Sequence, residues 1–64
     1  MAYRVYEFWN GGDDMKKISK RVETYEEALE IAKTSPLFGE CKRTYGEEGV
    51  VIRLNSGRKD VDFF

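Results

Sequence analysis

The chain contains no histidine, one cysteine (Cys41) and one proline (Pro36). Histidine is the most common general base and a frequent zinc ligand, so its absence argues against most hydrolytic and zinc-dependent enzymes. A lone cysteine cannot form a disulfide within the chain, and without histidine it lacks the usual activating partner of a thiol nucleophile. The sequence therefore predicts a protein that is not an enzyme and that suits a reducing compartment.

Motifs that hold phosphates or metal ions are also missing. Gly11-Gly12 precedes a predicted strand rather than a helix, which is typical of a turn and not of a phosphate-binding loop. Asp13-Asp14 lacks the regular acidic spacing and the final glutamate of a calcium-binding loop. The other acidic pairs fall at predicted turns or at a helix start, where solvation or capping explains them: Glu26-Glu27, Glu47-Glu48 and Asp60 with Asp62. We therefore expect no catalytic residue, no cofactor and no metal.

Long hydrophobic runs are absent as well. No apolar stretch approaches the roughly 18 residues that a membrane span needs, and no signal-peptide core follows Met1. The 11 basic and 12 acidic residues give a net charge of −1, which excludes a generally polycationic nucleic-acid binder but not a local basic patch. With 64 residues, 41% hydrophobic and 36% charged, the chain is expected to form one cytoplasmic globular domain over residues 1–64.

What is present predicts a sheet and one helix. Residues 3–9 are dense in aromatic and β-branched side chains and predict a strand. Residues 16–23 predict a second strand, in which Lys20 falls between Ile18 and Val22; either its side chain reaches the sheet rim or a bulge shifts the alternation. Thr24 and Glu27 form a capping box that opens a helix over residues 25–34.

Three further strands are predicted after the helix, which ends because Ser35 precedes Pro36. They cover residues 41–45, 50–54 and 59–64, and the middle one carries the strongest strand signal. The order ββαβββ predicts an α+β fold, an antiparallel sheet with one helix packed on one face. Leu29 and Ile52 are expected in its core.

Two charged surfaces are candidates for recognition. The first is an acidic helix surface consisting of Glu23, Glu26, Glu27 and Glu30. It could mimic a phosphate backbone and occupy a basic groove, although a solvated helix face is the commoner explanation. The second is a basic cluster consisting of Lys16, Lys17, Lys20 and Arg21, which could join Lys42, Arg43 and Arg53. It could contact phosphates, or it could be a set of edge-strand charges that deter aggregation.

Aromatic residues of the first strand form a third candidate. Tyr3, Tyr6, Phe8 and Trp9 lie on both sides of that strand, whereas a helix can cover only one face of the sheet. Some aromatic surface should therefore stay exposed, as an anchor for a protein or a stacking platform for bases, unless later residues cover it. Tyr6 and Trp9 are the candidate anchors, and Trp9, beside the turn, is expected to be the most exposed.

The chain resembles small anti-CRISPR proteins of phages and mobile elements that inhibit type I surveillance complexes, in particular type I-F. The shared residues are spread along the chain: Ala2-Tyr3, Glu7, Asn10, Glu23, Glu27-Ala28, Ile31-Ala32, Phe38, Glu47, Gly49, Gly57 and Val61-Asp62. The basic helix residues that a similar inhibitor is understood to use correspond here to Leu29, Glu30 and Thr34. Those roles therefore do not carry over.

The resemblance implies an inhibitor in the host cytoplasm that binds a CRISPR-Cas effector complex and blocks target DNA binding. Aromatic anchors such as Tyr6 or Trp9 would support the acidic helix surface in that role. Direct nucleic-acid binding is expected to be weak or absent, with the chain a monomer or a homodimer. The alternative is a small binding module for another partner, or a weak nucleic-acid binder that uses the basic cluster.

Overall fold

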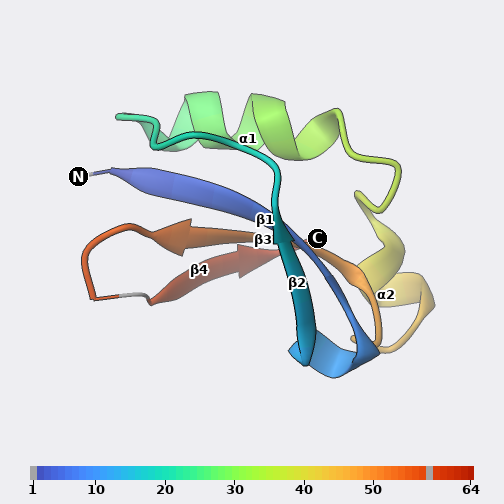
Figure 1. The fold of residues 1–64 in the computed structure, drawn as a ribbon. Helices are drawn as coiled ribbons and strands as arrows, with labels where there is room; N and C mark the ends of the chain where they lie inside the picture. Colours follow the sequence, from blue (N-terminus) through green and yellow to red (C-terminus); the bar gives the residue numbers. More distant parts are fainter. Residues whose placement is uncertain (1, 58) are drawn as a thin grey trace.

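The computed structural model describes residues 2–57 and 59–64, which form a four-stranded antiparallel sheet with one main helix across it (Figure 1). The strands are β1 (Tyr3–Trp9), β2 (Asp14–Lys17), β3 (Gly49–Leu54) and β4 (Asp60–Phe63), in the spatial order β2-β1-β3-β4. The helix α1 (Tyr25–Lys33) packs on β1 and β3. The predicted α+β class, with a helix on one face of an antiparallel sheet, is confirmed.

Helix α1 begins where its sequence predicts and ends one residue before the predicted end at Thr34. The Thr24 hydroxyl accepts a hydrogen bond from the Glu27 amide at 3.2 Å, as the capping box requires. The same hydroxyl lies 3.1 Å from the Glu27 carboxylate and donates to it, in place of the expected bond from the Thr24 amide. Lys33 is the last helical residue, and Thr34 caps the end before Ser35 and Pro36.

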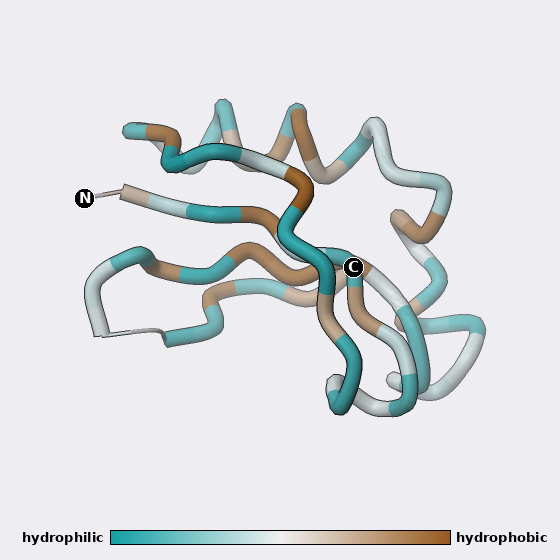
Figure 2. Tube along the Cα trace, in the orientation of Figure 1, coloured by the Kyte–Doolittle hydropathy of each residue, from teal (hydrophilic) through white to brown (hydrophobic). Residues whose placement is uncertain are grey.

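The core between α1 and the sheet consists of small helix residues facing branched strand residues. Ala28 and Ala32 are fully buried against Val5, Val50 and Ile52. Hydrophobic residues form a continuous stretch in β3 and recur along α1, whereas they alternate with hydrophilic residues in β1 (Figure 2). The prediction for Ile52 is confirmed, whereas that for Leu29 is wrong because the two alanines hold the centre and Leu29 is only half-buried at its edge.

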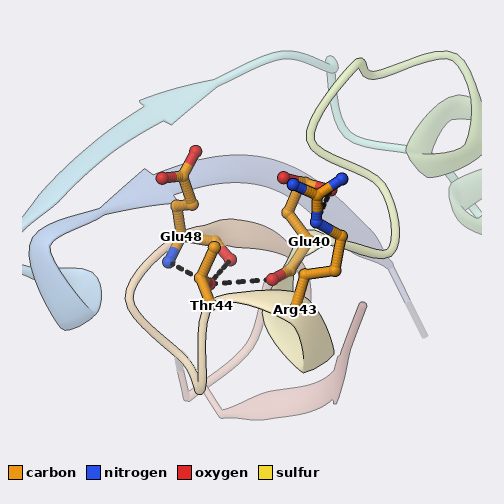
Figure 3. A network of polar contacts seen from close by, with 4 residues as sticks. All are labelled: Glu40, Arg43, Thr44 and Glu48. Atoms are coloured by element: carbon orange, nitrogen blue, oxygen red, sulfur yellow. Dashed lines mark hydrogen bonds and ion pairs between the residues drawn. The ribbon is translucent and has the colours of Figure 1, made fainter.

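Residues 40–43 form a one-turn helix, α2 (Glu40–Arg43), so the strand predicted over residues 41–45 is wrong and the observed order has two strands after the helices. Thr44 joins α2 to β3 (Figure 3): its hydroxyl donates to the Glu40 carbonyl at 2.8 Å and accepts from the Glu48 amide at 3.1 Å. Glu40 and Arg43 also form an ion pair at 3.7 Å within this turn. The Thr44 hydrogen bonds, which the weak alternation of the sequence cannot indicate, hold these residues in a helical turn.

The strand predicted over residues 16–23 is shorter than expected and interrupted. The Ile18 amide donates to the Val5 carbonyl, and Val22 forms an isolated antiparallel bridge with Tyr3. The three residues between Ile18 and Val22 therefore lie opposite Arg4 alone. The Ser19 hydroxyl accepts a hydrogen bond from the Val5 amide at 2.9 Å, in place of the backbone carbonyl that a regular neighbouring strand would offer. A bulge therefore explains the position of Lys20, which is exposed.

The turn between β1 and β2 is the 3₁₀ turn η1 (Asn10–Gly12), in which successive residues have positive φ. The Gly11 amide donates to the Glu47 carbonyl at 2.8 Å, which ties this turn to the segment after α2. Among the residues described, no helix is long and apolar enough to cross a membrane.

Candidate binding surface

Only one face of the sheet is covered by α1, and strand alternation decides which side chains point to the other. We call that second side the open face. On β1 it receives Arg4, Tyr6 and Phe8, because Val5 packs in the core under α1. The register with the neighbouring strands adds Met15, Lys17, Val51, Arg53 and Phe63 to it.

The open face is organised in rows that run across the strands. One row aligns Lys17, Tyr6, Val51 and Phe63. The adjacent row places Arg4 directly opposite Arg53, with Asp60 beyond it. Phe8 and Val51 are buried within this face, whereas Phe63 is 53% exposed and meets Phe8 edge-on at 5.9 Å between ring centres. A small apolar floor is thus surrounded by aromatic and cationic groups, of which Phe63 and Lys17 are exposed and Arg4, Tyr6 and Arg53 are half-buried.

Arg53 is held at the centre of the open face by three contacts. Its Nε donates to Asp60 Oδ1 at 2.6 Å, and one terminal nitrogen lies 3.6 Å from the Met15 sulfur. Its guanidinium carbon lies 5.1 Å from the centre of the Tyr6 ring, which is cation–π geometry. Three elements therefore fix this side chain in advance of any partner.

A bulge in β4 places Asp60 and Asp62, which are only two positions apart in the sequence, on opposite faces of the sheet. The register shifts between Ile52 and Arg53, so Asp62 faces Ile52 while Asp60 faces Arg53. Asp60 consequently lies on the open face, and Asp62 lies on the helix side, where it accepts a hydrogen bond from the Tyr25 hydroxyl. That hydrogen bond and partial burial raise the pKa of Tyr25 to about 12. Asp60 and Asp62 are structural partners of separate groups and do not form one acidic site.

The acidic helix surface lies on the helix side of the molecule, away from the open face. Its members Glu23, Glu26, Glu27 and Glu30 are all exposed. Tyr6 points to the opposite side of the sheet, so the structure does not bring it to these carboxylates. Trp9 shares the helix side by alternation but is half-buried, and the most exposed aromatic residues are instead Tyr45, at 97%, and Phe63.

The basic cluster is divided by the fold. Lys17 faces the open side opposite Tyr6, whereas Lys16 lies opposite Glu7 in the strand register and points to the other side. Lys20 and Arg21 lie in the bulge after β2, and Arg21 pairs with Glu23 at 3.6 Å. Lys42 and Arg43 lie on α2 and not on a strand beside β2, so the condition for the possible joining with Arg53 is not met.

Residue patterns alone do not single out Arg4, Met15 or Phe63 as surface groups. These residues lie on three different strands, so their common face depends on which strands are neighbours. The alternation of residues 3–9 indicates only which residues of β1 share a face. Among the residues described, no group of three potential ligands could hold a metal ion. Compared with protein-family models, curated proteins and solved structures, the chain matches none of them.

Proposed function

We propose that this chain is a binding protein without catalytic activity, and that the open face of its sheet is the surface that contacts the partner. In its specific form, the proposal is the one that the resemblance implies, an inhibitor that occupies a CRISPR surveillance complex and blocks target DNA. The observation that carries it is a sheet face with an exposed Phe63 and Met15 around a fixed Arg53, with α1 on the other side.

The composition of the open face supports this role. Aromatic residues, methionine and arginine are enriched at protein interfaces, and arginine and tyrosine are frequent among residues that dominate binding energy. Arg53 is already ordered by Asp60 and Tyr6, so little side-chain entropy is lost when a partner binds. A standard interface of about 800 Å² per partner would use about a fifth of the 4313 Å² of accessible surface. One face of a domain of this size can supply that area.

The acidic helix surface is a second candidate for contact with a basic groove. Its support is the exposure of all four carboxylates on one side of the molecule. The two predicted anchors do not serve it, since Tyr6 lies across the sheet and Trp9 is half-buried. The neighbouring Tyr25 ring is engaged by Asp62 and Tyr3. Surface carboxylates also contribute more to the rate of encounter than to affinity. We therefore assign the main contact to the open face.

The test measures binding of a fluorescent target DNA to a purified type I-F surveillance complex in the presence of the chain. We expect the wild-type chain to block it and Phe63→Ser to lose at least tenfold in potency, because removal of a central aromatic contact costs about 2 kcal/mol. Tyr45→Ser is the matched control, since it removes a tyrosine that is 97% exposed elsewhere on the surface.

Two outcomes would overturn the proposal. If the wild-type chain leaves DNA binding unchanged, the inhibitor function is wrong. If it inhibits and Phe63→Ser inhibits equally well, while Glu26→Lys/Glu30→Lys does not, the acidic helix surface is the working surface. Thermal melting of each variant checks that the fold is retained.

A further inference from the structure

Two arginines face each other across the central strands of the open face. Arg4 of β1 and Arg53 of β3 are direct register partners. Together with Tyr6, Leu54 and Asn55 they line a hollow of about 440 Å³, which we call the arginine hollow. Like charges directly opposite each other destabilise a sheet. We therefore expect each of the two arginines to have an acidic partner.

Among the residues that the structure describes, one carboxylate pairs with these two arginines. Asp60 bonds to Nε of Arg53 at 2.6 Å. Nε of Arg4 instead donates to the neutral amide oxygen of Asn55 at 2.6 Å. Within residues 2–57 and 59–64, no ion pair involves Arg4. The arginine hollow consequently has two guanidinium groups and one carboxylate, a net positive charge, and hydrogen-bond donors on the Arg4 terminal nitrogens.

We propose that the arginine hollow binds a phosphate group of a single-stranded nucleic acid that lies across the open face. This inference rests on the proposed role of that face and names the chemistry of its ligand. Guanidinium groups form bidentate hydrogen bonds with phosphate oxygens, and two of them on adjacent strands can grip one phosphate from both sides. The Asn55 amide oxygen positions Arg4 by accepting a hydrogen bond from its Nε, as the Asp60 carboxylate does for Arg53.

The neighbouring row explains why the ligand is a nucleic acid rather than a free anion. Lys17, Tyr6 and Phe63 lie one row further along the sheet, about 6.7 Å from the arginines by the strand rise. Cations beside aromatic rings are the combination with which sheet proteins bind single strands, because phosphates meet the charges and bases stack on the rings. Phe63 is 53% exposed and therefore available for stacking.

The exposed ring favours a single strand over a duplex. The Arg53 guanidinium already lies over the Tyr6 ring, so Phe63 is the ring of this face that is left for a base. Consecutive bases of a duplex are about 3.4 Å apart and stay stacked on each other. An unpaired strand can instead turn a base out onto Phe63 while its phosphate lies at the arginines.

The experiment is fluorescence anisotropy with a labelled ten-nucleotide oligothymidylate at low salt. We expect weak binding to the wild-type chain, weaker binding to a duplex of the same length, and at least fivefold weaker binding by Arg4→Gln. The slope of log affinity against log salt should fall by about 0.7 in Arg4→Gln, the value for one phosphate contact with a single strand. Arg43→Gln is the matched control, an arginine on α2 that is 80% exposed and paired with Glu40.

Competitors distinguish the possible sources of the anion. Inorganic phosphate should displace the oligonucleotide only at far higher concentration, and an oligoglutamate peptide should not displace it. Equal affinity of Arg4→Gln and wild type, a preference for the duplex, or tighter binding of the peptide would overturn the inference. The proposed function fails separately, when the wild-type chain leaves target DNA binding to the complex unchanged. If Phe63→Ser loses inhibition while Arg4→Gln retains it and binds the oligonucleotide normally, only the phosphate assignment is wrong.

Discussion

Individual residues on both sides of the sheet are positioned by specific side-chain contacts. Arg53 is fixed by Asp60, Met15 and Tyr6, and Tyr25 is fixed by Asp62. The two aspartates are two positions apart, and strict alternation would place them on one face. One bulge gives each a different partner, so the chemistry of both faces depends on it. Simple alternation of residues 59–64 predicts a strand there but not this division.

The Tyr25 phenol should make stability depend on alkaline pH. Its pKa is raised to about 12 in the folded state, against about 10 in an unfolded chain. Below pH 10 both states keep the proton and the contribution is complete. Between pH 10 and 12 the unfolded state loses the proton first, so stability falls as pH rises. Tyr25→Phe should lack this component, and should lose about 1 kcal/mol at pH 7 with the hydrogen bond.

Urea unfolding of both proteins between pH 8 and pH 12 measures this effect. The difference in unfolding free energy between wild type and Tyr25→Phe should shrink across pH 10–12. Parallel pH profiles would show that the contact with Asp62 does not hold the phenol proton.

At the scale of elements, strong local signals were sufficient where they agreed with packing. The capping box and Ser35-Pro36 predicted both ends of α1, and the β-branched run predicted β3. Residues 40–43 were mispredicted because a single turn of helix depends on the Thr44 hydrogen bonds and on closure against β3, which alternation cannot indicate. The bulge at residues 19–21 likewise depends on the Ser19 hydroxyl replacing a backbone partner.

The alanine-lined packing of α1 gives a prediction about its core. Ile52 is fully buried beneath Ala28 and Ala32, whereas Leu29 is half-buried at the edge. Ile52→Ala should cost about 2–5 kcal/mol, a large part of the stability of a domain this small. Leu29→Ala should cost about 1–2 kcal/mol, because water reaches its side chain in the folded state. Urea midpoints of the two variants provide the comparison.

A milder variant keeps this test informative if Ile52→Ala does not fold. Ile52→Val removes one methylene and should cost about 0.5–1.5 kcal/mol. A Leu29→Ala variant that unfolds as readily as Ile52→Ala would contradict this arrangement of the core.

For the whole molecule, the fold places one acidic set and one basic set of side chains on opposite sides of the sheet. Exposed glutamates occupy the helix side, while Arg4, Lys17 and Arg53 share the open face with Tyr6 and Phe63. The near-neutral composition conceals this separation, since net charge does not report which residues share a face. The aromatic content of β1 predicted exposed rings on that strand, and this prediction is wrong: none of its four rings is exposed, and the exposed ring of the open face is Phe63 of β4. The identity of the surface as a whole required the strand order, which no short motif specifies.

The most direct test of the open face as the binding surface is site-specific photocross-linking to the purified type I-F surveillance complex. A benzoylphenylalanine placed at position 63 keeps an aromatic ring there, and the same residue at position 30 examines the acidic helix surface. We predict that the probe replacing Phe63 cross-links to the complex, to its protein subunits or its RNA, and that the probe replacing Glu30 does not. Cross-linking from position 30 with none from position 63 would contradict the assignment of the binding surface.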